Sequence, residues 1–325
     1  MRVFISVLLN NSRRLMEQKQ RLLLFPILTT VAIAGAIFLN TQADKAGNIA
    51  IVSSGVLVPS FEFLNVTLLD ESPPLSELVA GKYDAVIAFD EQGGYEIQTF
   101  KSDEYRQMLE AVIEDPTSIQ ISDIGVRGNG TNIIGFIMMF VLMQGASLMF
   151  MFAEDKEKKQ IHRIAASPVS FVGYLFAYSF FCFAFLFIAT AVMLGIAFIV
   201  PGVDMGFGFF TYLSLIALLC ALSTSFGLFL VSLFKSADTS NMASSASVVL
   251  TSVLAGSFYS FDKGNGVLAA IIKILPQKAV LSLSESLEQG LSISSWFSDC
   301  AYVFVLIAIF MSIAVTKTRK DYMRR

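Results

Sequence analysis

The sequence predicts an α-helical polytopic membrane protein with six transmembrane helices and a small extracellular α/β domain between helices 1 and 2. Three observations lead to this fold class. Hydrophobic residues make up 55% of the 325 residues and charged residues only 15%, whereas a soluble domain carries roughly a quarter charged residues. Long stretches lack Asp, Glu, Lys and Arg altogether, and a strongly acidic segment separates the first two. The uncharged stretches are residues 22–43, 128–153, 164–203, 205–234 and 239–261.

Each uncharged stretch can cross a bilayer, because a spanning helix needs about 20 mainly apolar residues. A shorter apolar run near the end of the sequence supplies a sixth span. The first run is longer than the roughly 7–15 apolar residues of a cleaved signal peptide, so we expect it to be retained. The expected transmembrane helices are residues 22–39, 131–153, 168–200, 207–234, 241–261 and 296–316.

Basic residues gather on one side of the membrane if the six helices alternate in direction. Fifteen of the 23 Lys and Arg residues lie in the segments 1–21, 154–167 and 317–325 and at Lys235. Cytoplasmic loops are enriched in Lys and Arg, so we expect both termini in the cytoplasm. Residues 1–21 are expected to form an amphipathic helix there, and residues 317–325 a short tail.

The acidic segment, residues 40–130, is expected to be the extracellular domain. It holds fifteen acidic residues against five basic ones. Apolar runs at 49–53 and 84–89 and an alternating run at 95–100 are typical of strands. Helices are expected after Pro73 and over 103–114, where apolar residues recur with helical spacing.

Residues 262–295 are expected on the same outer side. The apolar run 267–275 is too short to cross the membrane and ends at Pro276. The following run, 278–290, shows helical spacing. Short apolar pieces of this length are usually re-entrant or interfacial, so two short helices are predicted to dip into the outer leaflet.

Groups that commonly carry catalysis are scarce. The single histidine, His162, lies among charged residues, which is more typical of a solvated helix than of an acid–base catalyst. The sequence has no metal-ligand cluster and no phosphate-binding loop. We therefore expect a protein that is not an enzyme and binds no cofactor itself. Nucleic acid is not expected as a partner, since no basic stripe lies outside the membrane-flanking segments.

Polar residues within two of the expected spans have two interpretations. Small hydroxyl side chains let helices pack closely, but they also suit a mildly polar translocation route. The uncharged stretches hold none of the charged groups that ion-coupled carriers place in mid-membrane. The candidate route residues are Gln144, Ser147, Ser244, Ser247, Thr251 and Ser252.

The segment 154–167 between spans 2 and 3 is the most informative stretch. Glu and Lys at close spacing favour a helix, with Ile161 and Ile164 on one face. Such a helix, held between two spans, is either a plain connector on the membrane surface or a docking surface for a cytoplasmic partner.

This segment resembles the coupling helix of ABC-2 type transporter permeases. Their pattern runs acid–basic–Glu–x–Gly–Thr–x–x–Arg–Leu–x–x–Ser/Thr–Pro, and the chain departs from it at the Gly-Thr pair, where it has Lys159 and Gln160. The sequence at 81–87, and Leu275-Pro276 followed by Gly290, also resemble elements of these permeases. The residues that the resemblance assigns to coupling are Glu154, Asp155, Lys156, Glu157, Lys159, Gln160, Arg163, Ile164, Ser167 and Pro168.

The resemblance implies a permease in a bacterial plasma membrane. Two permeases, alike or homologous, would form a dimer within the lipid. Each would be bound by a cytoplasmic ABC ATPase subunit, two copies per complex, which holds the ATP and Mg. The large outer domain favours export of a drug-, peptide- or lipid-like substrate. The alternative from another class is a membrane-anchored sensor or scaffold whose outer domain binds a ligand or partner.

Overall fold

A computed structural model describes residues 2–43, 48–52, 65–69, 72–74, 77–78, 82–89, 94–99, 103–114, 128–166, 170–200, 205–257 and 266–323. The chain forms two compact units. One is a small unit of residues 38–128, and the other is a helical bundle of residues 1–37 and 129–325.

The small unit contains a four-stranded sheet with the strand order β2-β1-β3-β4. Strand β1 is parallel to β2 and β3, and β3 is antiparallel to β4. Isoleucines of β1, β3 and β4 are buried together with Leu109 of the helix α4. The bounds are β1 Asn48–Val52, β2 Asn65–Leu69, β3 Ala85–Phe89, β4 Tyr95–Thr99 and α4 Asp103–Glu114.

The sequence predicted three of these strands and the helix α4, and all four are present. It did not predict β2, whose residues 65–69 pair in parallel with β1. The helix expected after Pro73 lies mostly outside the described residues. The predicted α/β character therefore holds for the part of this unit that the structure describes.

The helical bundle contains the apolar stretches of the sequence. Residues 1–37 enter as two helices, and the remainder follows from residue 129. The helices are α1 Arg2–Glu17, α2 Lys19–Ala43, α5 Asn129–Leu148, α6 Phe150–Glu157, α7 Gln160–Ala165, α8 Phe171–Ala197, α9 Phe209–Leu233, α10 Ala237–Leu254, α11 Gly266–Ile274, α12 Pro276–Glu288 and α13 Ile293–Met323.

Among the described residues, four helices are long and apolar enough to cross a membrane: 129–157, 171–197, 209–233 and 296–321. A fifth span results if α1 and α2, bent by 82° relative to each other, are counted together. The chain is therefore a polytopic helical membrane protein. Helix α10, which the sequence analysis counted as the fifth of six spans, is not among these candidates, because polar residues dominate its first half.

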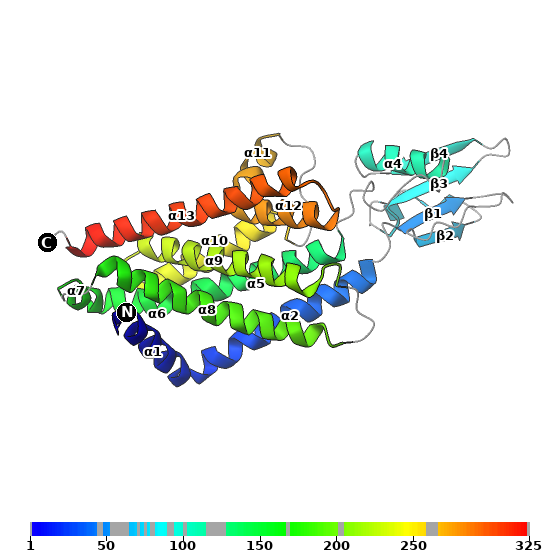
Figure 1. Cartoon of the computed structure of the whole chain (residues 1–325). Helices are drawn as coiled ribbons and strands as arrows, with labels where there is room; N and C mark the ends of the chain where they lie inside the picture. Colours follow the sequence, from blue (N-terminus) through cyan, green and yellow to red (C-terminus); the bar gives the residue numbers. More distant parts are fainter. Residues whose placement is uncertain are drawn as a thin grey trace. The chain divides into compact units, whose positions relative to one another are not determined.

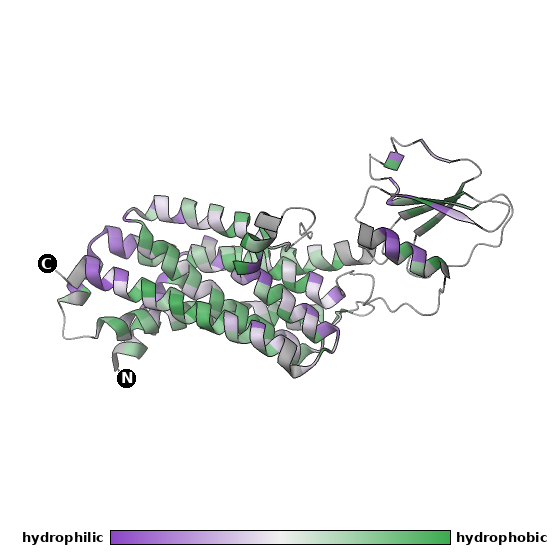
Figure 2. Cartoon of the chain, turned by 90° about the horizontal axis from the view of Figure 1, so that it is seen from above, coloured by the Kyte–Doolittle hydropathy of each residue, from purple (hydrophilic) through white to green (hydrophobic). Residues whose placement is uncertain are grey.

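Helix α9 lies at the centre of the bundle and contacts α5, α8, α10, α12 and α13. Figure 2 shows hydrophobic residues along most of the bundle's length. Close approach of α5 and α9 depends on Gly145, where an added Cβ would overlap Ser223 Oγ. Ser223 in turn donates a hydrogen bond of 2.8 Å to the Val141 carbonyl. Small residues at a helix crossing are typical of membrane bundles.

The two ends of the bundle carry different elements (Figure 1). The start of α1, the end of α13 and the short helices α6 and α7 lie at one end, and α12 lies near the other. Helix α13 also runs to Met323, so the described part of the predicted tail 317–325 continues the last helix.

Candidate functional site

The segment 154–167, predicted as one helix, is divided in the structure. Residues 154–157 end α6, and α7 begins at Gln160. Lys159 adopts a left-handed backbone conformation with φ 58°, the one non-glycine residue with positive φ in the described part of the chain. Glycine adopts this conformation without steric cost, whereas other residues rarely do. The glycine of the coupling-helix pattern is therefore explained by the backbone, and Lys159 keeps that conformation.

Asp155 connects α6 to α1. Its Oδ2 accepts a hydrogen bond of 2.7 Å from Arg14 Nη1, and the carboxylate is almost completely buried. A buried carboxylate is strongly destabilised without a partner. Arg14 therefore holds the amphipathic N-terminal helix against the segment between spans 2 and 3.

Lys156 connects α6 to the end of α9. Its ammonium group donates hydrogen bonds to the carbonyls of Val231, Ser232 and Phe234 at 3.2, 3.1 and 2.6 Å. The last carbonyls of a helix have no partners within the helix, and a cation there also meets the negative end of the helix dipole. Lys156 is only 3% exposed, so these carbonyls account for its three donors.

Glu157 connects α6 to the start of α10. Its Oε2 accepts a hydrogen bond of 3.0 Å from the backbone N–H of Ala237, the first residue of α10. The first N–H groups of a helix lack partners within the helix, and a carboxylate there is favoured by the helix dipole. Three consecutive charged residues thus tie one short segment to three different helices.

Of the remaining predicted coupling residues, the structure describes Glu154, Lys159, Gln160, Arg163 and Ile164. Ile161 is completely buried and fixes α7 to the core, with Ile164 partly buried beside it. Glu154 pairs with Lys158 across 3.7 Å on the surface. Ser167 and Pro168 lie outside the described residues. The exposed residues of the segment are Glu157, Lys158, Lys159, Gln160, Arg163 and Ala166. Glu157 binds Ala237, and the other four polar residues, Lys158, Lys159, Gln160 and Arg163, are here called the outward face.

The candidate route residue Gln144 is used inside the bundle. Its Nε2 donates to the Phe25 carbonyl at 3.3 Å and to Thr29 Oγ1 at 3.0 Å. The side chain is 1% exposed, and its partners are both on α2. This geometry favours interhelical packing of α5 on α2, while Ser147 remains half-buried.

The four candidates on α10 divide by burial. Ser244 and Ser252 are fully buried on the side of α10 that packs against α5, α6 and α9. Ser247 and Thr251 are half-buried, and Thr251 Oγ1 accepts a hydrogen bond of 2.7 Å from Gln277 of α12. Among the described residues, the buried hydroxyls of Ser244 and Ser252 have no hydrogen-bond partner, whereas Thr251 links α10 to α12.

Apolar cavities lie elsewhere, between α8, α9, α12 and α13. One has a volume of about 680 Å³ and is lined mainly by aromatic and aliphatic side chains. A smaller one of about 280 Å³ shares Phe183 and Ala221 with it. None of the six candidate route residues lines either cavity. The larger cavity is lined by Phe183, Phe210, Thr211, Ser214, Leu215, Ala217, Leu218, Ala221, Leu283, Leu287, Trp296, Cys300 and Phe304.

Sequence reasoning missed several of the residues that matter here. Arg14 could not be paired with Asp155 from the sequence, because the two lie far apart along the chain. Asp299 lies within the predicted span 296–316, so that span is not free of charge. Within the described residues, His, Cys, Asp and Glu form no group of three or more that could hold a metal ion.

Comparison with known proteins identifies one family. The model of the family described as ABC-2 type transporter matches residues 105–288, which is more than half of the chain. The matched region runs from α4 to the end of α12 and contains the whole segment 154–167. No curated protein matches the chain.

Proposed function

The chain belongs to the ABC-2 type transporter family, and we propose that it is the permease subunit of an ATP-driven exporter. The family supplies the coarser statement, a membrane permease component of an ABC-type transporter. The finer proposal covers six spans, an extracellular domain at residues 40–130, cytoplasmic termini in a bacterial plasma membrane, and outward transport. It also includes a second permease, alike or homologous, and two ATPase subunits that hold ATP and Mg.

The observation that carries the proposal is the set of contacts made by residues 155–157. Arg14, the last carbonyls of α9 and the first N–H of α10 are all bound by this short segment. A push on the segment 154–167 would therefore reach three helices through the end of α6. An ATPase that docks on the outward face and closes on ATP would shift these helices together and change the route between the permeases.

The two roles of the segment fall on different residues. Asp155 and Lys156 are buried, so they transmit movement within the chain. Lys158, Lys159, Gln160 and Arg163 are exposed, so they would contact the ATPase. Charged residues exposed on an interface steer a partner and set its orientation.

The apolar cavity between α8, α9, α12 and α13 supports a hydrophobic or amphipathic cargo. Its volume of about 680 Å³ falls within the range of small-molecule sites, roughly 300–1,000 Å³. Aromatic side chains on its walls, such as Phe210 and Trp296, favour apolar groups. A drug-, peptide- or lipid-like substrate fits this lining better than a highly charged one.

The test is ATP hydrolysis that accompanies the full-length chain. Purified from membranes of its own host, the chain is expected to carry an ATPase subunit with Mg-dependent activity. Lys158→Glu with Arg163→Glu reverses the charge of the outward face, and we expect it to lower the bound ATPase activity at least tenfold. The matched control, Arg319→Glu with Lys320→Glu, reverses two exposed charges on α13 and is expected to retain the activity.

Two results would contradict this proposal. If the outward-face variant keeps its ATPase while the control also keeps it, the segment is only a connector. If the intact chain carries no ATPase, the sensor or scaffold alternative gains. Deleting residues 48–123 then separates the two, because an exporter with an accessory outer domain keeps ATP hydrolysis, whereas a sensor loses its binding of ligand or partner.

A further inference from the structure

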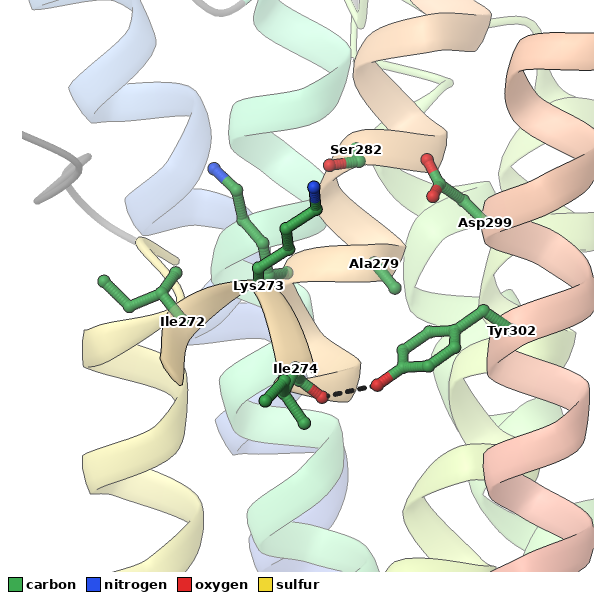
Figure 3. A pocket seen from close by; sticks show the side chains of 8 residues that line it. Ile272, Lys273, Ile274, Ala279, Ser282, Asp299 and Tyr302 are labelled. Carbon is green, nitrogen blue, oxygen red and sulfur yellow. Dashed lines mark hydrogen bonds between the residues drawn. The ribbon is translucent and has the colours of Figure 1, made fainter. Parts of the chain in front are cut away.

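A third cavity lies between the short helices α11 and α12 and the helix α13. It has a volume of about 680 Å³ and is lined by both polar and apolar side chains. Figure 3 shows Ser282 and Asp299 on one side of this pocket and Tyr302 lower down, with its hydroxyl turned to the Ile274 carbonyl. That hydrogen bond is 2.7 Å long and fixes α13 to the end of α11. The pocket is lined by Ile272, Lys273, Ile274, Lys278, Ala279, Ser282, Asp299 and Tyr302.

The pocket combines charges of both signs. Lys273 of α11 and Lys278 of α12 each bring an ammonium group, while Asp299 of α13 brings a carboxylate. Ser282 adds a hydroxyl. Lysine ammonium groups bind phosphate through charge-assisted hydrogen bonds, and a carboxylate binds an ammonium ion. These three charged groups match a ligand that carries a phosphate and an amine close together.

An apolar surface begins where the polar pocket ends. Ile271 and Ile274 of α11 are more than half exposed. On α13, Val305 and Ile309 follow Tyr302 with helical spacing and are also exposed, so they continue one face of that helix. Tyrosine is enriched where a membrane protein passes from hydrocarbon to headgroups. Together the polar pocket and this apolar face have the amphipathic profile of a lipid.

We propose that this pocket binds the zwitterionic headgroup of a membrane phospholipid that carries a primary amine. Lys273 and Lys278 hold the phosphate, Asp299 holds the ammonium group, and the acyl chains lie along Val305 and Ile309. The inference rests on the topology in the proposed function, which places α11 and α12 in the outer leaflet. It does not rest on the ATPase or on transport.

The test measures which lipids stay on the purified full-length chain, by native mass spectrometry after exchange into mixed phospholipids. Phosphatidylethanolamine and phosphatidylglycerol with identical acyl chains are offered in equal amounts. We expect phosphatidylethanolamine to be retained several-fold over phosphatidylglycerol. Lys273→Gln with Lys278→Gln is expected to lower the retention of both lipids about tenfold, since each loses its phosphate partners.

Asp299→Asn is the diagnostic variant, because it removes only the partner of the amine. It is expected to abolish the preference for phosphatidylethanolamine while phosphatidylglycerol stays bound. Lys317→Gln, an exposed lysine at the opposite end of α13, is the matched control and should change neither. All of these side chains lie at surfaces or pocket walls, and thermal unfolding of each variant verifies its folding.

Three outcomes would overturn the proposal. The first is an unchanged preference in Asp299→Asn. The second is unchanged retention in the double lysine variant. The third is soluble phosphoethanolamine or inorganic phosphate binding as tightly as the lipid, since that identifies a water-soluble ligand. If the unsubstituted chain retains its ATPase but neither lipid, this proposal alone is contradicted. If it retains phosphatidylethanolamine but carries no ATPase, only the proposed function is contradicted.

Discussion

At Lys159 the backbone conformation, rather than a side-chain contact, limits which amino acids the position accepts. Its φ of 58° ends α6 and starts α7. For most residues the left-handed conformation costs about 1–2 kcal/mol, whereas for glycine it is free. The structure thus gives a physical reason for the glycine in the coupling-helix pattern and for the strain that this chain carries instead.

Substitutions at Lys159 separate conformation from charge. Lys159→Asn and Lys159→Val both remove the ammonium group, but asparagine tolerates positive φ and valine does not. We expect the free energy of unfolding to be highest for Lys159→Gly, lower for Lys159→Asn and lowest for Lys159→Val, with about 1–2 kcal/mol between the extremes. Unfolding in mixed detergent micelles measures this order. Equal stability of the asparagine and valine variants would show that the left-handed turn does not form in solution.

Lys156 is a residue whose hydrogen-bond partners could not be predicted from the sequence. The pattern predicted the segment and its charged residues as features of the family, and the matched region 105–288 contains the segment. The partners of Lys156 and Glu157 are carbonyls at the end of α9 and the N–H of Ala237, which lie more than seventy residues further along the chain. Helix-terminus partners of this kind leave no periodic signal in the sequence.

Among the helices, the α5–α9 crossing shows how small residues set the spacing of the bundle. Gly145 leaves no room for a Cβ, because Ser223 Oγ fills that space and donates to Val141. Gly227 approaches Gly145 from α9, with its own Cβ position 3.2 Å from the Gly145 carbonyl oxygen. In membrane helices, where the hydrophobic effect contributes little to association, such close packing is a principal source of stability.

Alanine substitutions at two glycines test this packing. Gly145→Ala is expected to lower stability by about 1–3 kcal/mol, as overpacking commonly does. Gly35 of α2 has no atom within 4 Å of an added Cβ, so Gly35→Ala should be neutral or stabilise the helix by up to about 1 kcal/mol. Unfolding of both variants in the same detergent mixture gives the comparison, and a Gly145→Ala protein as stable as Gly35→Ala would refute the close crossing.

Helices and strands were predicted well where hydrophobic periodicity is strong, and poorly where their position depends on pairing between strands. The runs that became α8 and α9 match their predicted spans within about three residues at each end. Strand β2 was missed, because its placement depends on parallel pairing with β1 and parallel strands need a crossover rather than a local turn. Helix α10 was predicted from an absence of charge, although serine and asparagine make its first half polar.

For the whole molecule, the number of spans depends on whether α10 crosses the membrane. Its polar first half excludes it from the helices that qualify by hydropathy alone. In a bundle, however, a helix is not obliged to be apolar all round, because polar residues can face neighbouring helices. Ser240, Ser244 and Ser252 are buried inside the chain, whereas Met242 and Leu250 are exposed. The apolar side of α10 therefore faces outward, as a spanning helix requires.

Cysteine labelling from one side of the membrane decides this point. Lys235 and Lys273 flank α10, and each is exposed. In a background without the three native cysteines, we expect an impermeant maleimide added outside intact cells to label Lys273→Cys, and to label Lys235→Cys only after permeabilisation. Lys82→Cys in the small unit should label from outside and Lys158→Cys only after permeabilisation, since six alternating helices and the positive-inside rule place them so. Labelling of Lys235→Cys and Lys273→Cys from the same side would mean that α10 is re-entrant, and the number of spans would then be five, with α1 and α2 counted as one.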